Sequence, residues 1–174
     1  MNSSEAEYWD LFDENRVFTG AMHRRGDPVP DGSFHLVVHS WIMDPSGLFL
    51  ISQRQKGRPY ELKWERTGGS VLAGESSLGG AVREAMEELG VDLTDAPCYF
   101  IKSVKRPRFH DFYDAWLFIV PKEDVTVKTD PEEVHAFMWA TYDEMKNLKE
   151  NNELVKSSRY FDEVYDLFRR IRRR

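Results

Sequence analysis

The segment Gly69–Val91 reads GSVLAGESSLGGAVREAMEELGV, and it is the most informative stretch of the chain. Apolar residues recur in it at the spacing of one helix face, at Leu78, Val82, Ala85, Met86 and Leu89. This spacing predicts a helix from about Leu78 to Leu89, with Ser76 or Ser77 able to cap its start. Gly90 stands where a glycine commonly ends a helix, because glycine adopts the left-handed backbone conformation without strain.

Three glutamates lie near the end of this predicted helix, at Glu84, Glu87 and Glu88. Spacings of three and four residues bring their carboxylates to one face. Like charges at such spacings destabilise a helix by roughly 0.2–0.5 kcal/mol per pair, and the negative end of the helix dipole also disfavours them. A fold that keeps this arrangement usually binds a cation there, and clustered carboxylate oxygens suit Mg²⁺ or Mn²⁺.

The same segment fills every position of a known motif, G-x5-E-x7-R-E-U-x-E-E-x-G-U, in which U is apolar. Its apolar positions are Ala85 and Val91, and its fixed residues are Gly69, Glu75, Arg83, Glu84, Glu87, Glu88 and Gly90. This is a complete Nudix box, so the chain resembles the Nudix hydrolase superfamily. At average residue usage of roughly 6% each, a chance match at a given start is on the order of one in a billion.

The resemblance implies a Nudix-type α/β/α sandwich with a mixed β-sheet over roughly Ser33–Lys149. The residue patterns also predict a mixed sheet covered on both faces, in the α/β (α+β) class. The predicted strands are Tyr8–Phe12, Val17–Met22, His35–Met43, Leu48–Arg54, Thr67–Leu72, Pro97–Ser103, Phe109–Val120 and Val134–Trp139. A capping box at Thr141–Glu144 opens a helix through about Leu148, and helical spacing from Phe161 to Ile171 predicts a last helix.

The chain has 174 residues, which is the length of one domain. We expect a single Nudix domain, with residues 1–32 as an N-terminal hairpin and loop extension, 33–149 as the core and 150–174 carrying the C-terminal helix. With 24 basic and 30 acidic residues, the net charge of −6 argues against non-specific nucleic-acid binding. Cys98 is the single cysteine, and neither a secretory signal nor a membrane-spanning apolar run is evident. We therefore expect a cytoplasmic protein with no membrane partner, either a monomer or a homodimer.

Hydrolysis of a phosphoanhydride requires that the phosphates are held, that their charge is neutralised and that a water is aimed in line. By resemblance, the metal ligands are the backbone carbonyl of Gly68 and the carboxylates of Glu84, Glu87 and Glu88. The residues that resemble the bracing part of the box are Gly69, Glu75, Arg83 and Gly90. Arg83 offers a planar fork suited to a carboxylate, and a substrate contact by the same group stays open.

The general base has two candidate positions in this sequence. Nudix enzymes use either a box glutamate, here Glu87 or Glu88, or a glutamate in a loop before a late strand. The segment Asp130-Pro131-Glu132-Glu133 precedes such a predicted strand. We favour Glu133 over Glu132 as the catalytic loop residue, and the alternative is that both are solvated loop acids.

Basic residues in loops or at strand ends could contact phosphates, although a solvated surface charge is the simpler interpretation of each: Arg24, Arg25, Arg54, Lys56, Arg58, Lys105, Arg106 and Arg108. The candidate substrate-binding residues are Arg54, Arg58, Tyr60 and Asp114. Tyr60 could stack on a base, and acidic residues on the strand that matches Asp114 face the site in some relatives. His35 and His39 lie on one face of their predicted strand, and we interpret them as satisfied core histidines.

The predicted function is Mg²⁺-dependent hydrolysis of a phosphoanhydride in a nucleoside diphosphate linked to another moiety, or in a nucleoside triphosphate, with Mn²⁺ as an alternative ion. The upstream segment FHLVVHSWIMDPSGLFLISQR is also similar to type I isopentenyl-diphosphate isomerases, in which a metal-binding histidine matches His35. Those enzymes use a cysteine where this chain has Gly68-Gly69-Ser70. A non-catalytic nucleotide-binding Nudix module is a third interpretation, which a loss of box glutamates would favour, and none is lost.

Overall fold

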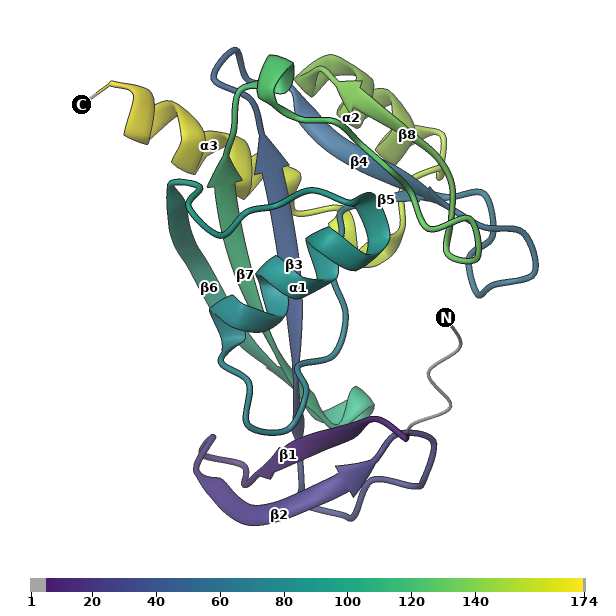
Figure 1. Cartoon of the computed structure of the whole chain (residues 1–174), viewed down its shortest axis with the longest axis vertical. Coiled ribbons are helices and arrows are strands. Elements are labelled where there is room, and N and C mark those ends of the chain that lie inside the picture. Colours follow the sequence, from purple (N-terminus) through teal and green to yellow (C-terminus); the bar gives the residue numbers. More distant parts are fainter. Residues whose placement is uncertain (1–5, 174) are drawn as a thin grey trace.

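The computed structural model describes residues 6–173, which form eight β-strands and three α-helices (Figure 1). The strands are β1 (Tyr8–Phe12), β2 (Phe18–Arg24), β3 (His35–Met43), β4 (Phe49–Arg54), β5 (Trp64–Glu65), β6 (Cys98–Arg106), β7 (Asp111–Ile119) and β8 (Val134–Ala140). The helices are α1 (Ser77–Leu89), α2 (Tyr142–Glu150) and α3 (Phe161–Arg172). Within residues 6–173, no helix combines the length and the hydrophobicity needed to span a membrane.

Six of the strands form one mixed sheet in the order β5-β4-β3-β7-β6, and β8 also pairs with β4. The pair β3 and β7 is parallel, and the other pairs are antiparallel. Because β8 follows β4 over its whole length, β3 and β5 must share the opposite edge of β4. This confirms the predicted mixed sheet and explains why it opens between β3 and β4.

The central strand β3 is buried on both faces, as its dense apolar sequence predicts. Val38 and Ile42 belong to the core beneath α1, whereas Trp41 and Met43 belong to the core shared with α2 and α3. Each such side chain contributes about 1.5–3 kcal/mol relative to an exposed position. Figure 1 shows α1 crossing the face of β3, so the helices and the sheet form the predicted α/β/α sandwich.

Helix α1 begins and ends close to the predicted positions. The Ser76 side chain accepts a hydrogen bond from the Gly79 N–H at 3.0 Å, and Gly90 ends the helix with φ +64°. The small residues Ala81 and Ala85 are fully buried against the sheet. Ser40 of β3 donates a hydrogen bond to the Ala81 carbonyl at 2.9 Å, so the sheet fixes the position of the helix that carries the three glutamates.

The predicted strand Thr67–Leu72 is wrong as a regular strand, because this segment makes only two isolated bridges to β3. The short strand β5 was not predicted. β3 pairs with β4 only at Ile42 and Met43. In the part of β3 that precedes Ile42, the two strands separate, and the N–H groups of Ser40 and Val38 donate instead to the carbonyls of Thr67 and Gly69. Gly68 has φ +154°, and a Cβ there would overlap the Val38 carbonyl oxygen, so the segment bends too closely against β3 for a regular strand.

The N-terminal hairpin of β1 and β2 forms as predicted, although β2 continues to Arg24 rather than ending at Met22. The hairpin is attached to the core by backbone bonds in both directions between Phe12 and Phe34, at 2.8 and 2.9 Å. Trp9 also stacks on His35 of β3, with ring centroids 4.1 Å apart. An isolated two-stranded hairpin is marginally stable in water, so these contacts with the core are what hold it in place.

Candidate active site

A cleft of about 540 Å³ lies where β3 and β4 separate. This volume is within the usual range of small-molecule sites. Its lining includes nine of the residues predicted from the sequence: Arg54, Arg58, Gly68, Gly69, Arg83, Glu84, Glu87, Glu88 and Glu133. The predicted site residues outside the lining are Tyr60, Glu75, Gly90 and Asp114.

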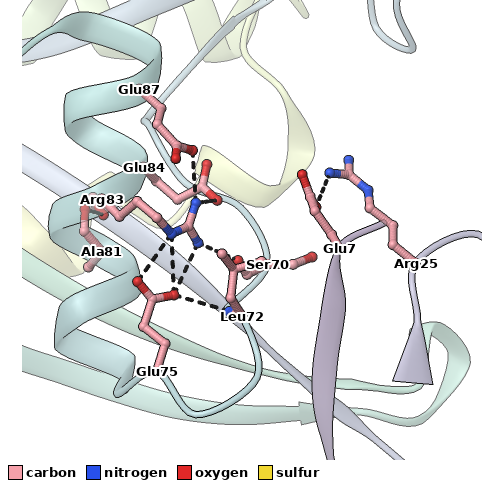
Figure 2. A network of polar contacts seen from close by, with 10 residues as sticks. Glu7, Arg25, Ser70, Leu72, Glu75, Ala81, Arg83, Glu84 and Glu87 are labelled. Carbon is pink, nitrogen blue, oxygen red and sulfur yellow. Dashed lines mark hydrogen bonds and ion pairs between the residues drawn. The ribbon is translucent and has the colours of Figure 1, made fainter. Parts of the chain in front are cut away.

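Arg83 lies at the centre of a polar network that joins α1 to the preceding loop (Figure 2). Its Nη1 donates to Glu84 Oε1 at 2.9 Å and to Glu87 Oε2 at 2.8 Å. Its Nη2 donates to the Ser70 carbonyl at 2.8 Å, and its Nε donates to Glu75 Oε1 at 3.1 Å. Burial opposes the charge of Arg83, yet the hydrogen bonds that it donates to Glu75 and the negative charges of Glu84, Glu75 and Glu87 raise its pKa.

Glu75 joins the other side of this network to the loop. Its Oε2 accepts a hydrogen bond from the Leu72 N–H at 3.1 Å while the same carboxylate binds Arg83. This is the geometry of a brace between the loop and the helix, as the sequence resemblance implies. The carboxylate of Glu84 packs directly against the backbone of Gly69. A Cβ at Gly69 would therefore overlap all three carboxyl atoms.

The cleft raises the pKa of two of the three glutamates near the end of α1. Burial, opposed by Arg83, raises the pKa of Glu84 to about 7. Burial also raises the pKa of Glu88 well above its usual value, and the nearby charges of Glu65, Glu84 and Glu133 act in the same direction. These carboxylates crowd together in a place where their negative charge is poorly solvated, and a cation would relieve that cost.

The donor set fits Mg²⁺ or Mn²⁺, since these ions prefer carboxylate and carbonyl oxygens. Within residues 6–173, no three carboxylate, imidazole or thiol groups already surround a common point. Figure 2 shows the reason, because the Arg83 guanidinium points at Glu84 and Glu87 and holds both carboxylates. The Glu87 side chain is 58% exposed, so it can rotate away from Arg83 without disturbing the core.

The loop before β8 brings Glu133 into the same cleft. The Asp130 N–H donates to the Glu88 carbonyl at 3.0 Å, which fixes this loop against the end of α1. Glu133 lines the cleft and forms an ion pair with Arg58 at 2.8 Å, whereas Glu132 is exposed and outside the lining. Of the two loop acids, only Glu133 lines the cleft together with Glu84, Glu87 and Glu88.

Two of the four candidate substrate contacts also lie in the cleft. Arg54 is held by Glu65 of β5 at 2.5 Å and by the Pro59 carbonyl at 2.5 Å. Arg58 lies in the loop between β4 and β5 and is paired with Glu133. Tyr60, in the same loop as Arg58, is 60% exposed and does not line the cleft. The arrangement supports a phosphate contact for the two arginines and gives no support to base stacking by Tyr60.

Asp114 does not line the cleft, and its contacts are with other parts of the protein. It is buried in β7, and both its oxygens accept hydrogen bonds from Arg16, at 2.6 and 2.5 Å. Arg16 lies in the turn of the N-terminal hairpin and also donates to Ser103. Burial opposes the ionised form of Asp114, but the hydrogen bonds from Arg16 and two serines lower its pKa overall. The pair attaches the hairpin turn to the sheet.

Several cleft residues were not predicted from the sequence. Glu65 and Asp130 add carboxylates from β5 and from the loop before β8, and Ser52 adds a polar side chain from β4. Glu7 was also missed, and it lines the cleft beside Arg25, which was only one of eight basic loop candidates. No local signal separates these residues from solvated charges, because their place depends on how the hairpin and β5 dock.

The positions of His35, His39 and Cys98 can be compared with the site that an isopentenyl-diphosphate isomerase would need. His35 is buried against Trp9, and burial lowers its pKa to about 4. His39 is buried too, and its Nδ1 lies 2.9 Å from the Tyr160 hydroxyl. Cys98 lies on β6 and does not line the cleft. Gly68, Gly69 and Ser70, which occupy the sequence position of the isomerase cysteine, do line it. Among the described residues, no thiol is therefore positioned to exchange protons with an alkene in the cleft.

Comparison with known proteins points to the same family as the box residues of the site. The family model for the NUDIX domain matches residues 33–161. An uncharacterized Nudix hydrolase of Listeria monocytogenes is 35% identical over 156 residues, which cover 86% of this chain and 88% of the relative. One from Streptomyces coelicolor is 37% identical over 59% of this chain and 57% of its own length.

Solved structures show the same fold at lower sequence identity. The crystal structure of DR0079 from Deinococcus radiodurans superimposes with a TM-score of 0.71 at 21% identity, over 94% of this chain and 98% of that one. The MutT protein of Methanosarcina mazei superimposes with a TM-score of 0.56 at 23% identity, over 80% of this chain and 95% of its own. With a family match over most of its length and five of the seven fixed box residues in the lining of one cleft, the chain belongs to the Nudix family and is a Nudix hydrolase.

Proposed function

We propose that this enzyme depends on Mg²⁺, with Mn²⁺ as an alternative, and that it hydrolyses a phosphoanhydride in a nucleoside diphosphate linked to another moiety or in a nucleoside triphosphate. Pyrophosphatase-type hydrolysis is the general activity of the family to which the chain belongs. The observation that carries the proposal is the convergence of Glu84, Glu87 and Glu88 with Glu133 in one cleft.

The charge of the cleft explains why a cation is needed. Its lining holds seven carboxylates and four arginines, so a substrate that carries several phosphates would be repelled by the protein alone. The residues that would hold the ion are Glu84, Glu87 and Glu88, with the carbonyl of Gly68. A divalent ion bound there supplies charge neutralisation for the phosphates and lowers the pKa of a coordinated water.

The chain's own residues then position the substrate and move the proton. Arg54 and Arg58 lie where their guanidinium groups can bind phosphate oxygens, and Arg54 is fixed in orientation by Glu65. Glu133 is the proposed base that takes a proton from the attacking water, and its pairing with Arg58 orients the carboxylate. As the new P–O bond forms, the bridging oxygen leaves with the electrons of the broken P–O bond.

A substrate panel tests this proposal. Nucleotides, dinucleotides, nucleotide sugars, polyphosphates and a prenyl diphosphate would be incubated with Mg²⁺, with Mn²⁺ or with EDTA, in ¹⁸O-labelled water and with product identification. We expect cleavage of at least one phosphoanhydride, only with a divalent ion, and with the label in a phosphate product. Isomerised prenyl diphosphate without phosphate release, or full activity in EDTA, would contradict the proposal.

The remaining expectations about this enzyme stay predictions. A small phosphorylated molecule is the partner that the family suggests. We predict no nucleic-acid or membrane partner and a cytoplasmic location, on the grounds of charge and composition alone. Sedimentation of the purified chain would decide between a monomer and a homodimer.

A further inference from the structure

The N-terminal hairpin contributes a pair of charged residues to the cleft from outside the matched family region. Glu7 precedes β1 and Arg25 follows β2, and both lie in the cleft lining with Gly69 and Ser70. The family match begins at residue 33. Figure 2 shows this pair across Ser70 from the carboxylates of Glu84 and Glu87, so the hairpin forms the wall opposite α1.

The position of this wall is fixed by hydrogen bonds to the box loop itself. The Ala73 N–H donates to the Tyr8 carbonyl at 2.8 Å, and the Gly74 N–H donates to Asp10 Oδ2 at 2.8 Å. The Arg25 N–H donates to the Glu7 carbonyl at 2.8 Å, which extends the hairpin ladder to the two charged residues. Arg25 is therefore held at a fixed place relative to the box rather than on a mobile tail.

The ion pair between Arg25 and Glu7 is not needed to hold the hairpin in place. Its atoms are 2.6 Å apart, but the two side chains are 56% and 45% exposed. Pairs with such exposure contribute about 0–1 kcal/mol to stability. A phosphate or carboxylate that enters the cleft can therefore replace Glu7 as the partner of Arg25 at small cost.

The other arginines of the cleft are less free to change partners. Arg83 and Arg54 are 22% and 24% exposed. Arg83 is bound to Glu75, Glu84 and Glu87 and to the Ser70 carbonyl, and Arg54 is bound to Glu65 and to the Pro59 carbonyl. Arg58 is 35% exposed and is paired with the proposed base Glu133. Arg25 is the most exposed cleft arginine among the described residues, and its partner Glu7 has no place in the proposed chemistry.

We propose that Arg25 binds an anionic group of the substrate on the far side of the phosphoanhydride from α1, with Glu7 as its resting partner. This inference rests on the proposed function. The hairpin then sets a preference for substrates that carry a further phosphate or carboxylate beyond the two phosphates held at α1. Arg25 is a specificity-determining residue under this proposal, and it takes no part in the proton transfer.

Two inorganic probes of different length test the proposal without requiring turnover. Titration calorimetry with Ca²⁺ would measure binding of tripolyphosphate and of the shorter methylenediphosphonate, with product analysis to verify that tripolyphosphate stays intact. Arg25→Ala should weaken tripolyphosphate binding by about 10-fold, the worth of one charge-assisted hydrogen bond, and methylenediphosphonate binding by less than about 2-fold. Arg25→Lys should restore most of the affinity, and Glu7→Gln should increase it by about 3-fold.

Arg24→Ala is the matched control, because Arg24 ends β2 one position earlier and lies outside the cleft lining. It should bind both probes as the wild type does, and all variants should melt at the wild-type temperature. With a substrate found in the panel that carries a further anionic group, Arg25→Ala should raise KM and leave kcat within about 2-fold.

The outcomes separate this inference from the proposed function. Equal affinity of Arg25→Ala and wild type for tripolyphosphate, or an equal loss for both probes, overturns the role of Arg25. Either of these binding results leaves the proposed function standing, provided that the wild type cleaves a panel substrate. Cleavage of a panel substrate without any binding of tripolyphosphate overturns the inference as well. If the wild type cleaves nothing and binds neither probe, the proposed function fails and the inference fails with it.

Discussion

Replacing Gly69 by alanine tests whether the position of one carboxylate controls the activity. A Cβ at Gly69 would lie closer than 3.0 Å to all three carboxyl atoms of Glu84, whereas ordinary contact begins at 3.4 Å. Gly69 is not among the glycines with positive φ, so alanine fits its backbone. The atoms that must move are the far end of a flexible side chain. We therefore expect the fold to absorb the methyl group by displacing the Glu84 carboxylate.

The size of the effect follows from this displacement. To reach ordinary contact, the carboxylate must move by about 1 Å, and a misplacement of that size in a reacting site costs about 10²-fold in rate. The Gly69→Ala variant should lose about 10²-fold in kcat/KM, measured with a substrate from the panel. Its melting temperature should change by no more than about 3 °C, the equivalent of about 1 kcal/mol for a chain of this length.

Gly79→Ala is the matched control for this experiment. It adds the same methyl group inside the box, but the new Cβ would meet Ser76 Oγ at 3.1 Å and Glu75 Cγ at 3.3 Å, and neither of these residues is one of the three α1 glutamates that line the cleft. We expect near-wild-type turnover and no loss of stability, because alanine favours a helix over glycine by about 1 kcal/mol. Wild-type kcat/KM in Gly69→Ala would refute the reasoning. So would a variant that unfolds, because the side chain would then not have absorbed the clash.

Substitutions of the box glutamates, of His35 and of Asp114 test the site and the contacts that support it. Glu87→Gln or Glu88→Gln should lower kcat by about 10² or more, since charge stabilisation by a bound metal is worth several kcal/mol, and near-wild-type turnover in both would contradict their assignment. Burial lowers the pKa of His35 to about 4, so between pH 6.5 and 4 the unfolded chain takes up a proton that the native chain refuses; the His35 contribution should therefore lower stability by about 3 kcal/mol across that window, whereas protonation of Glu84 and Glu88, whose pKa values are raised, acts in the opposite direction. Urea unfolding at a series of pH values would measure this, and His35→Phe should lose that part of the slope; an unchanged slope would show that His35 is not the cause. Asp114→Asn should lower the melting temperature by weakening the buried pair with Arg16 but leave kcat and KM within about 3-fold, whereas a large rise in KM at constant stability would indicate a substrate contact.

The features that were predicted well depend on neighbours in the sequence. The start, the end and the glutamate face of α1 follow from Ser76, Gly90 and a regular spacing of residues. The capping box of α2 is equally local, and the structure confirms both of its hydrogen bonds, from the Glu144 N–H to Thr141 at 3.2 Å and from the Thr141 N–H to Glu144 at 2.7 Å. In these cases the physical cause of the structure lies within one or two turns of chain.

The features that were missed depend on distant parts of the chain. The segment 67–72 reads as a strand, but the separation of β3 from β4 and the close approach of Gly68 to Val38 decide its shape. Asp114 was a reasonable substrate contact until Arg16, 98 residues away, was found to bind both its oxygens. Likewise, Glu7 reaches the cleft only because the hairpin docks on the box loop.

If the carboxylates of Glu84, Glu87 and Glu88 form the binding site of a divalent cation that the enzyme needs, the purified protein should bind such an ion without substrate. Electron paramagnetic resonance of free Mn²⁺ would measure this binding directly, in the wild type and in Glu88→Gln, without any substrate. We predict that the wild type binds Mn²⁺, that Mg²⁺ competes for the same site, and that Glu88→Gln weakens the affinity by at least about 10-fold, as expected for the loss of one charged ligand. Equal Mn²⁺ binding by both proteins, or none by the wild type, would contradict the account.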